Sequence, residues 1–191
     1  FTLNDVNDAF NVDLALHNQS VPSGGFDSGW SGTTLTKKGA GLLVLSALNT
    51  YSGKTDVMGG SLSLAGSGDI GASSQLLLSG SDSRFDISYL TGSSTTINNL
   101  AGVSGSRVTL SGGNPANLSA KTLVIHNVAN ADSNGNTEFA GVIDDAGLGS
   151  NVTKTGAGSL TLSGDNTYTG MTAVDEGSLF IGSGGTSGSL M

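Results

Sequence analysis

The sequence predicts an all-β fold in which short strands wind into a stack of coils, a β-solenoid. Three observations predict it: the composition, the alternation of apolar residues, and a short internal period. Gly, Ser, Thr and Asn make up about half of the 191 residues, whereas only 2 Glu and 5 Lys occur. Because Gly and Asn oppose helix and Thr is a poor helix former, this composition argues against helical folds.

The apolar residues are placed in a way that argues against disorder. They make up 36% of the chain, and many fall in short runs that alternate with polar residues, as at Leu43/Leu45 and Leu160/Leu162. Alternation with a period of two is typical of a strand with one buried face. In the strand 159–163 it places Leu160 and Leu162 inside and leaves Ser159, Thr161 and Ser163 outside.

Two segments of the chain are copies of one another. Residues 35–64 and 152–181 agree at 17 of 30 positions, without a gap, at a constant offset of 117. The shared positions include strand leucines and two groups of turn residues: Gly39, Gly41, Leu43, Leu45, Asn49, Tyr51 and Gly53 in the first copy, and Gly156, Gly158, Leu160, Leu162, Asn166, Tyr168 and Gly170 in the second. The first pair of glycines in each copy is predicted to lie where the backbone turns with positive φ.

A shorter period of 19 residues runs within each copy. Leu43 recurs as Leu62, Leu160 as Leu179, and Val57 finds Leu76 at the same distance. Such a period favours coils stacked with like residues above like, rather than the hairpins of a sandwich. At about 19–24 residues a coil, the chain would make about eight to ten coils. Further strands are predicted around these residues: Leu76–Leu78, Phe85–Ile87, Ile97, Val108–Leu110, Leu123–Ile125 and Val142–Ile143.

The chain is predicted to have two parts. Residues 1–31 contain Trp30, His17 and Pro22 and lack the repeat pattern, so they are interpreted as an irregular capping segment. Residues 32–191 form the predicted β-solenoid. The chain begins with Phe1 and shows no signal peptide, which favours a fragment of a longer protein.

The second copy resembles a known repeat. Its residues Thr153–Gly170, followed by Val174 and Glu176–Leu179, are similar to the passenger-associated repeat of Gram-negative autotransporters, and residues 36–62 match it too, departing at Ala47. The middle stretch around Ile97–Gly102 resembles the linking coils of such passengers. The resemblance implies a right-handed parallel β-helix, exported through the outer membrane by a C-terminal β-barrel that this chain lacks.

The resemblance also implies a function outside the cell, at the bacterial surface. Passengers of this kind serve in adhesion, in aggregation or in presenting another domain, and the repeats aid transport and folding of the passenger. The implied partners are a host-surface protein or glycan, a second copy of the chain, and its own β-barrel. The alternative is a β-helix scaffold for a hydrolase, a protease or a carbohydrate-active enzyme, whose catalytic part lies outside this chain.

The net charge limits the kinds of partner, and the cysteine content limits the sources of stability. The formal net charge of −8 argues against nucleic acid and anionic membrane surfaces. The chain has no Cys, so its stability must come from packing and hydrogen bonding. No apolar run approaches the roughly 18 residues of a membrane-spanning helix.

Two motifs that suggest chemistry are better explained as loops. Gly66–Gly71 satisfies the dinucleotide-binding pattern GxGxxG, but the residues after it predict a strand, where that site needs a helix. A glycine-rich corner is therefore expected. Ser28, in Asp-Ser-Gly, resembles the surroundings of a serine-protease nucleophile, yet His17 is the sole histidine before it and the chain is too short for the double barrel.

Several carboxylates, histidines and tyrosines are of types that can bind ligands or act in catalysis. Asp144–Asp145 and the pair Asp82/Asp86 could serve as glycosidase carboxylates, but neighbouring residues of a strand point to opposite faces, and a solvated turn is expected. His17 and His126 are too far apart in sequence for a metal pair, and no calcium-binding repeat is present. Tyr51 and Tyr168 could stack on a ligand, but their equivalent placement favours turn packing. The sequence thus predicts no catalytic residue, cofactor or metal site, and a protein that is not an enzyme.

Overall fold

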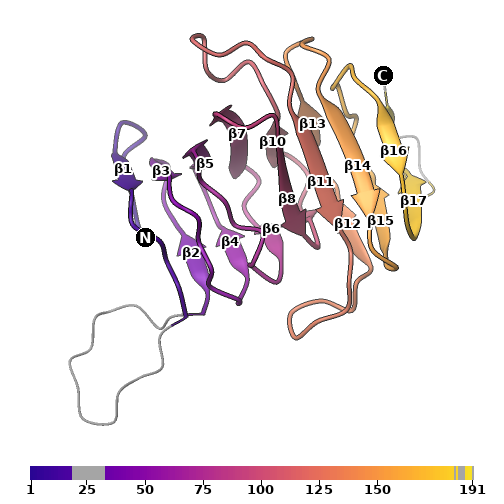
Figure 1. Cartoon of the computed structure of the whole chain (residues 1–191), viewed down its shortest axis with the longest axis horizontal. Coiled ribbons are helices and arrows are strands. Elements are labelled where there is room, and N and C mark those ends of the chain that lie inside the picture. The colour runs from indigo at the N-terminus through magenta and orange to yellow at the C-terminus, as the bar shows by residue number, and fades with distance from the viewer. Residues whose placement is uncertain (19–32, 183, 185–187, 191) are drawn as a thin grey trace.

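The computed structural model is a parallel β-helix whose three sides are three β-sheets (Figure 1). It describes residues 1–18, 33–182, 184 and 188–190. The six-stranded sheet comprises, in spatial order, β1 (Ala9–Val12), β3 (Leu42–Leu45), β5 (Ser61–Gly66), β7 (Arg84–Leu90), β10 (Arg107–Thr109) and β13 (Val142–Asp144).

The other two sides are built in the same way. The four-stranded sheet has the order β16 (Thr172–Val174), β14 (Asn151–Thr155), β11 (Thr122–His126) and β8 (Ser94–Asn98). The seven-stranded sheet has the order β17 (Ser178–Ile181), β15 (Ser159–Leu162), β12 (Thr137–Phe139), β9 (Ala101–Gly102), β6 (Leu76–Leu78), β4 (Thr55–Val57) and β2 (Leu35–Lys37).

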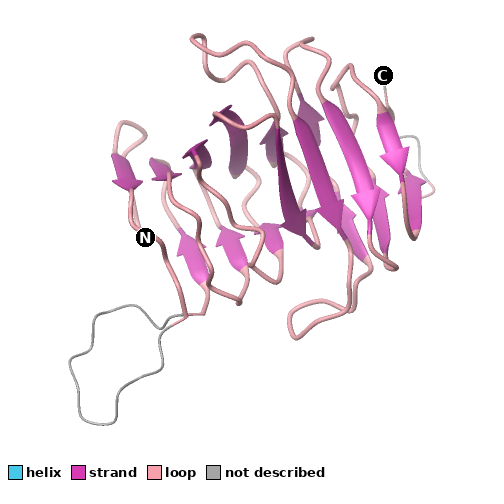
Figure 2. Ribbon diagram, in the orientation of Figure 1, coloured by secondary structure: helices cyan, strands magenta, loops and turns pink. Residues whose placement is uncertain are grey.

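All pairs of these strands are parallel, and the described residues contain no helix (Figure 2). The single antiparallel bridge among them, Ala129 to Asn134, lies in a loop. The predicted fold class, an all-β parallel β-helix, is confirmed, and its right-handedness stays a prediction. None of the described residues forms a helix long and apolar enough to cross a membrane.

The core is a stack of apolar side chains inside the coils. Leu43 pairs with Leu62 across β3 and β5, and Leu160 pairs with Leu179 across β15 and β17, as the period of 19 predicts. Leu43, Leu62 and Leu160 are fully buried, because each lies between coils above and below. Leu179 is only half-buried, since β17 is the outermost strand of its sheet.

Coil length varies more than the repeats indicate. Val57 pairs with Leu78, not with Leu76, so the period there is 21 residues and the prediction is wrong. Gly102 pairs with Phe139, 37 residues later. These longer coils carry loops; the largest sheet has seven strands, and Thr2 forms a parallel bridge to Lys38 beside the first of them.

The two repeat copies lie on different sides of the β-helix. The strands of the first copy, β2 and β3, belong to the seven-stranded and six-stranded sheets. Their equivalents in the second copy, β14 and β15, belong to the four-stranded and seven-stranded sheets. The offset of 117 residues is therefore not a whole number of coils. Besides a shift along the axis, each strand of the second copy lies on a neighbouring side of the three-sided helix.

The first residues of the chain are more regular than predicted. β1 pairs in parallel with β3, from Ala9 with Leu42 to Val12 with Leu45, and so adds a strand to the six-stranded sheet. The boundary at residues 31/32 stays a prediction. The interpretations of Pro22, Ser28 and Trp30 lie outside the described residues.

The repeat glycines meet two different backbone requirements. Gly39 and Gly156 have φ of 74° and 75°, the left-handed region that favours glycine. Gly41 and Gly158 do not, so that part of the prediction is wrong. They permit close approach instead: a Cβ would lie 2.6 Å from the Asp8 carbonyl oxygen at Gly41 and 2.0 Å from the Gly135 carbonyl oxygen at Gly158.

Candidate interaction surface

The predicted repeat positions form a buried frame. Leu43, Leu45, Leu160 and Leu162 are core residues, and the Asn and Tyr positions of both copies are 0–2% exposed. Ser163, predicted to lie outside, is only 7% exposed, because the exposed Glu138 of the neighbouring coil covers it and accepts a hydrogen bond from its Oγ at 2.5 Å.

The two repeat asparagines tie adjacent coils together. Asn166 Nδ2 donates to the carbonyl oxygens of Gly164 and Ser189, and its Oδ1 accepts a hydrogen bond from the Ile143 amide at 3.0 Å. Asn49 makes the corresponding three bonds in the first copy, with its Oδ1 on the Leu16 amide at 2.9 Å. These side chains satisfy backbone groups that no strand pairs.

The repeat tyrosines also have a structural position. The hydroxyl group of Tyr51 lies 2.6 Å from Thr55 Oγ1, and that of Tyr168 lies 2.6 Å from Thr172 Oγ1. Burial raises the pKa of both phenols, so they stay neutral hydrogen-bonding groups at physiological pH. Neither ring is placed to stack on a ligand at the surface.

Sequence reasoning missed a pair of buried lysines. Lys37 Nζ donates to the carbonyl oxygens of Lys38, Gly39 and Gly59 at 3.1, 2.7 and 3.0 Å. Lys154 Nζ makes the same three bonds 117 residues later, at 2.7, 2.7 and 3.1 Å. Burial lowers the pKa of both amino groups. The signal was available, because the two lysines are identical residues of the repeat.

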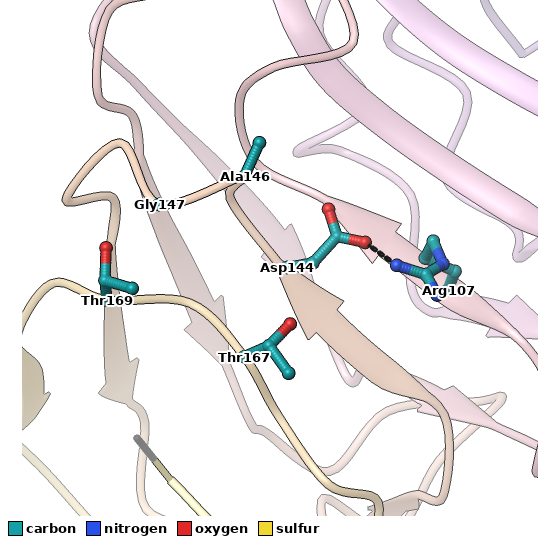
Figure 3. Close-up of a pocket in the computed structure, with 6 residues that line it drawn as sticks. All are labelled: Arg107, Asp144, Ala146, Gly147, Thr167 and Thr169. Atoms are coloured by element: carbon teal, nitrogen blue, oxygen red, sulfur yellow. Dashed lines mark hydrogen bonds and ion pairs between the residues drawn. The ribbon is translucent and has the colours of Figure 1, made fainter.

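The outward side of the coils contains the hollows. One of about 470 Å³ lies beside the end of β13 (Figure 3). Its wall carries an ion pair of Arg107, from β10, with Asp144, from β13. Thr167 and Thr169, from the Asn-Tyr turn of the second repeat copy, line the other side with Ala146 and Gly147.

Asp145 supports this hollow from inside and is not the solvated turn residue that was predicted. It is fully buried. Burial alone would raise the pKa of its carboxyl group, but hydrogen bonds from the Thr169, Ser150 and Gly147 amides and from the Thr169 hydroxyl hold that pKa below its usual value. A buried carboxylate therefore fixes the turn of residues 145–150 against the second repeat.

The candidate catalytic and metal-binding residues do not converge. Asp144 is paired with Arg107 at the surface while Asp145 points inward, so these carboxyl groups do not flank a common substrate position. His126 Nδ1 lies against Thr155 Oγ1 at 3.1 Å, far along the chain from His17. Among the described residues, no group of three or more His, Asp or Glu side chains could hold a metal ion. Gly66 ends β5 and is followed by turns and then β6, the corner that was predicted.

Comparison with known proteins shows which family the two repeat segments match. The model of the family Passenger-associated-transport-repeat matches residues 35–64 and 152–179. The chain carries two passenger-associated transport repeats. These repeats are the two segments that share the lysine, asparagine and tyrosine hydrogen bonds, so the resemblance to an autotransporter passenger is confirmed at both copies.

A curated relative supports the same assignment. The chain is 47% identical over 57 residues to the Adhesin BmaC autotransporter of Brucella suis biovar 1 (strain 1330). The aligned part is 29% of this chain and 2% of the length of that adhesin, so the chain spans a small part of the relative it matches. No solved structure matches the chain.

Proposed function

We propose that this chain is a segment of a passenger exported to the bacterial surface, where it acts as a stalk or adhesive surface and not as an enzyme. The observation that carries the proposal is that the two transport repeats occupy the segments with the shared hydrogen-bonded frame. Hydrogen bonds from buried Lys and Asn side chains to backbone carbonyl oxygens hold each coil on the next. The residues on the outward faces are not needed for this stacking and can vary in sequence.

The frame also supports a role in the passenger's own folding and transport. Each coil pairs mainly with the coils beside it, so coils can add one after another at a growing end. The hydrolase alternative is favoured by no observation on the described residues. Adhesion to a host-surface protein or glycan and association of two copies remain the proposed forms of contact.

The proposal is tested by displaying the chain on a non-adherent bacterium, fused to a passenger-free carrier. We expect more adhesion to coated surfaces or more aggregation than with the carrier alone. If the chain is only a stalk, a peptide tag at its N-terminal end should become more accessible to antibody than the same tag on the carrier. Surface display without any of these gains would overturn the proposal, as would release of products from a polysaccharide or a protein substrate.

A further inference from the structure

The outward face of the six-stranded sheet brings polar side chains into two rows along the helix axis. Register places Ser63 beside Asp86, and Asp86 beside Thr109. The second row places Arg84 beside Arg107, the two arginines of the chain. We call the six residues Ser63, Arg84, Asp86, Tyr89, Arg107 and Thr109 the polar strip.

The polar strip contains polar atoms that the protein does not satisfy. Ser63 Oγ, Arg84 Nε and Thr109 Oγ1 have no hydrogen-bond partner, and the other such buried side-chain atom found in the described residues is Asn127 Oδ1. Ser63 and Thr109 are each 2% exposed. Unpaired buried groups cost free energy, and because Ser63 and Arg84 line one hollow, these two favour an external partner. Arg84 can move to admit it, because its half-exposed side chain is held by one ion pair, to Asp86 at 3.8 Å.

A β-bulge adds an aromatic ring to the polar strip. The register of β5 against β7 shifts between Ser63 and Ala65, so that Ala65 pairs with Tyr89. Tyr89 is thereby directed outward, 41% exposed, and its hydroxyl donates to the Gly113 carbonyl oxygen at 2.8 Å. With Ser63, Arg84 and Asp86 it lines a hollow of about 420 Å³.

The chemistry of this hollow selects its ligand. Arg84 is a donor and Ser63 can be either donor or acceptor. Asp86 Oδ1 already accepts hydrogen bonds from the amide and hydroxyl groups of Ser88, so its Oδ2, beside Arg84, is the acceptor. Neighbouring hydroxyl groups of a sugar both donate and accept, and an aromatic ring such as Tyr89 packs on the apolar face of a sugar ring. An acidic ligand is disfavoured by Asp86 and by the net charge of −8. We propose that the polar strip binds a short chain of neutral sugars.

The strip is long enough for more than one sugar. Beyond Arg107 it continues into the hollow lined by Asp144 and Thr169. From β5 to β13 the sheet advances by three strand spacings, about 14 Å. The bound sugars therefore lie along the axis. This inference rests on the proposed adhesive function and names its ligand class.

Calorimetric titration of the 191-residue chain with neutral gluco-, galacto- and manno-tetrasaccharides tests the inference, with tetragalacturonate as the acidic control. We expect at least one neutral tetrasaccharide to bind, and the acidic one not to. Tyr89→Ala and Arg84→Lys should each weaken binding at least tenfold. Tyr89→Phe keeps the ring but loses the hydrogen bond to Gly113, and should bind within threefold of the parent. Phe180→Ala, which removes an exposed ring on another sheet, should leave binding unchanged.

Each contrary result has a distinct meaning. No binding of any neutral tetrasaccharide at millimolar concentration overturns the inference. So does loss of binding in Tyr89→Phe equal to that in Tyr89→Ala, because the tyrosine would then act only by anchoring the loop at Gly113. Bacteria that display the chain could adhere equally well after the glycans of the target surface are removed by enzymes. The ligand is then not a sugar, and the proposed adhesive function stands without this inference. Thermal unfolding of each variant shows that the fold is intact.

Discussion

At the scale of single residues, stability depends on which side of a strand a side chain occupies. Leu160 is fully buried, whereas its neighbour Thr161 faces outward and is half-buried. Leu160→Ala should lower the free energy of unfolding by about 2–4 kcal/mol, because it removes apolar contacts and leaves a cavity between coils. Thr161→Ala should cost less than about 1 kcal/mol. Urea unfolding measures both, and equal losses would mean that both faces of the strand are buried.

The buried lysines make a second prediction at this scale. Lys37→Met should destabilise the chain by about 1–3 kcal/mol, because three carbonyl oxygens lose a hydrogen bond from the buried amino group. Lys38→Met is the matched control, since Lys38 is the adjacent residue and its side chain is exposed. The midpoints of urea unfolding should separate the two variants. A Lys37→Met variant as stable as the parent would show that the apolar stem, not the amino group, is what matters.

Asp145 predicts how stability responds to acid. Its pKa in the folded chain lies below the usual value, so the folded state favours the charged form. The stabilisation is therefore fully present above about pH 4 and is lost as the pH falls through the folded-state pKa. Asp145→Asn should cost about 1.5–3 kcal/mol at pH 7 and flatten the loss of stability as the pH falls below about 4.

The control is Asp144→Asn, which removes a surface ion pair and should cost less than about 1 kcal/mol at pH 7. Denaturation in urea across this pH range gives both values. An unchanged pH dependence in Asp145→Asn would assign the acid sensitivity to other carboxyl groups.

At the scale of elements, each coil depends mainly on its neighbours. β15 pairs with β12 and β17, and β3 pairs with β1 and β5, so damage to one coil should stay local. Limited proteolysis of Leu160→Ala should cut first within residues 150–185 and spare the region around Leu43. Leu43→Ala is the reciprocal control and should be cut first near its own coil. Identical fragments from the two variants would indicate that the stack unfolds as one unit.

At the scale of the whole molecule, the described chain leaves strand edges unpaired at both ends. β1 lies at one end of the stack, and β16 and β17 lie at the other (Figure 1). Phe10 in β1 and Phe180 in β17 are 49% and 54% exposed. Because unpaired strands with exposed apolar residues invite pairing, we expect association that increases with concentration.

Light scattering over a dilution series measures this association. Phe180→Lys should reduce it, since a charge on an edge strand opposes edge-to-edge contact. Thr161→Lys, on the paired strand next to it, is the control for added charge. A chain that stays monomeric at millimolar concentration would show that the edges are protected.

The sequence alone determined the fold class and much of the repeated frame. Alternating leucines and a gapless 30-residue repeat, at an offset of 117, indicate stacked strands because burial of one strand face follows a period of two wherever it occurs. The turn positions Asn49 and Asn166 were likewise found from their equivalence. These are local or repeated signals, which a sequence carries directly.

Only the tertiary structure decided where those elements lie around the axis. Coil length changes when a loop is inserted, so the second repeat is rotated by one side and its turn at Thr167 and Thr169 comes to line the hollow beside Arg107. The rows that join Arg84 to Arg107, and the bulge that turns Tyr89 outward, depend on pairing between residues 23 or more apart. No local pattern encodes such pairing, because it is set by how each coil closes on the one before it.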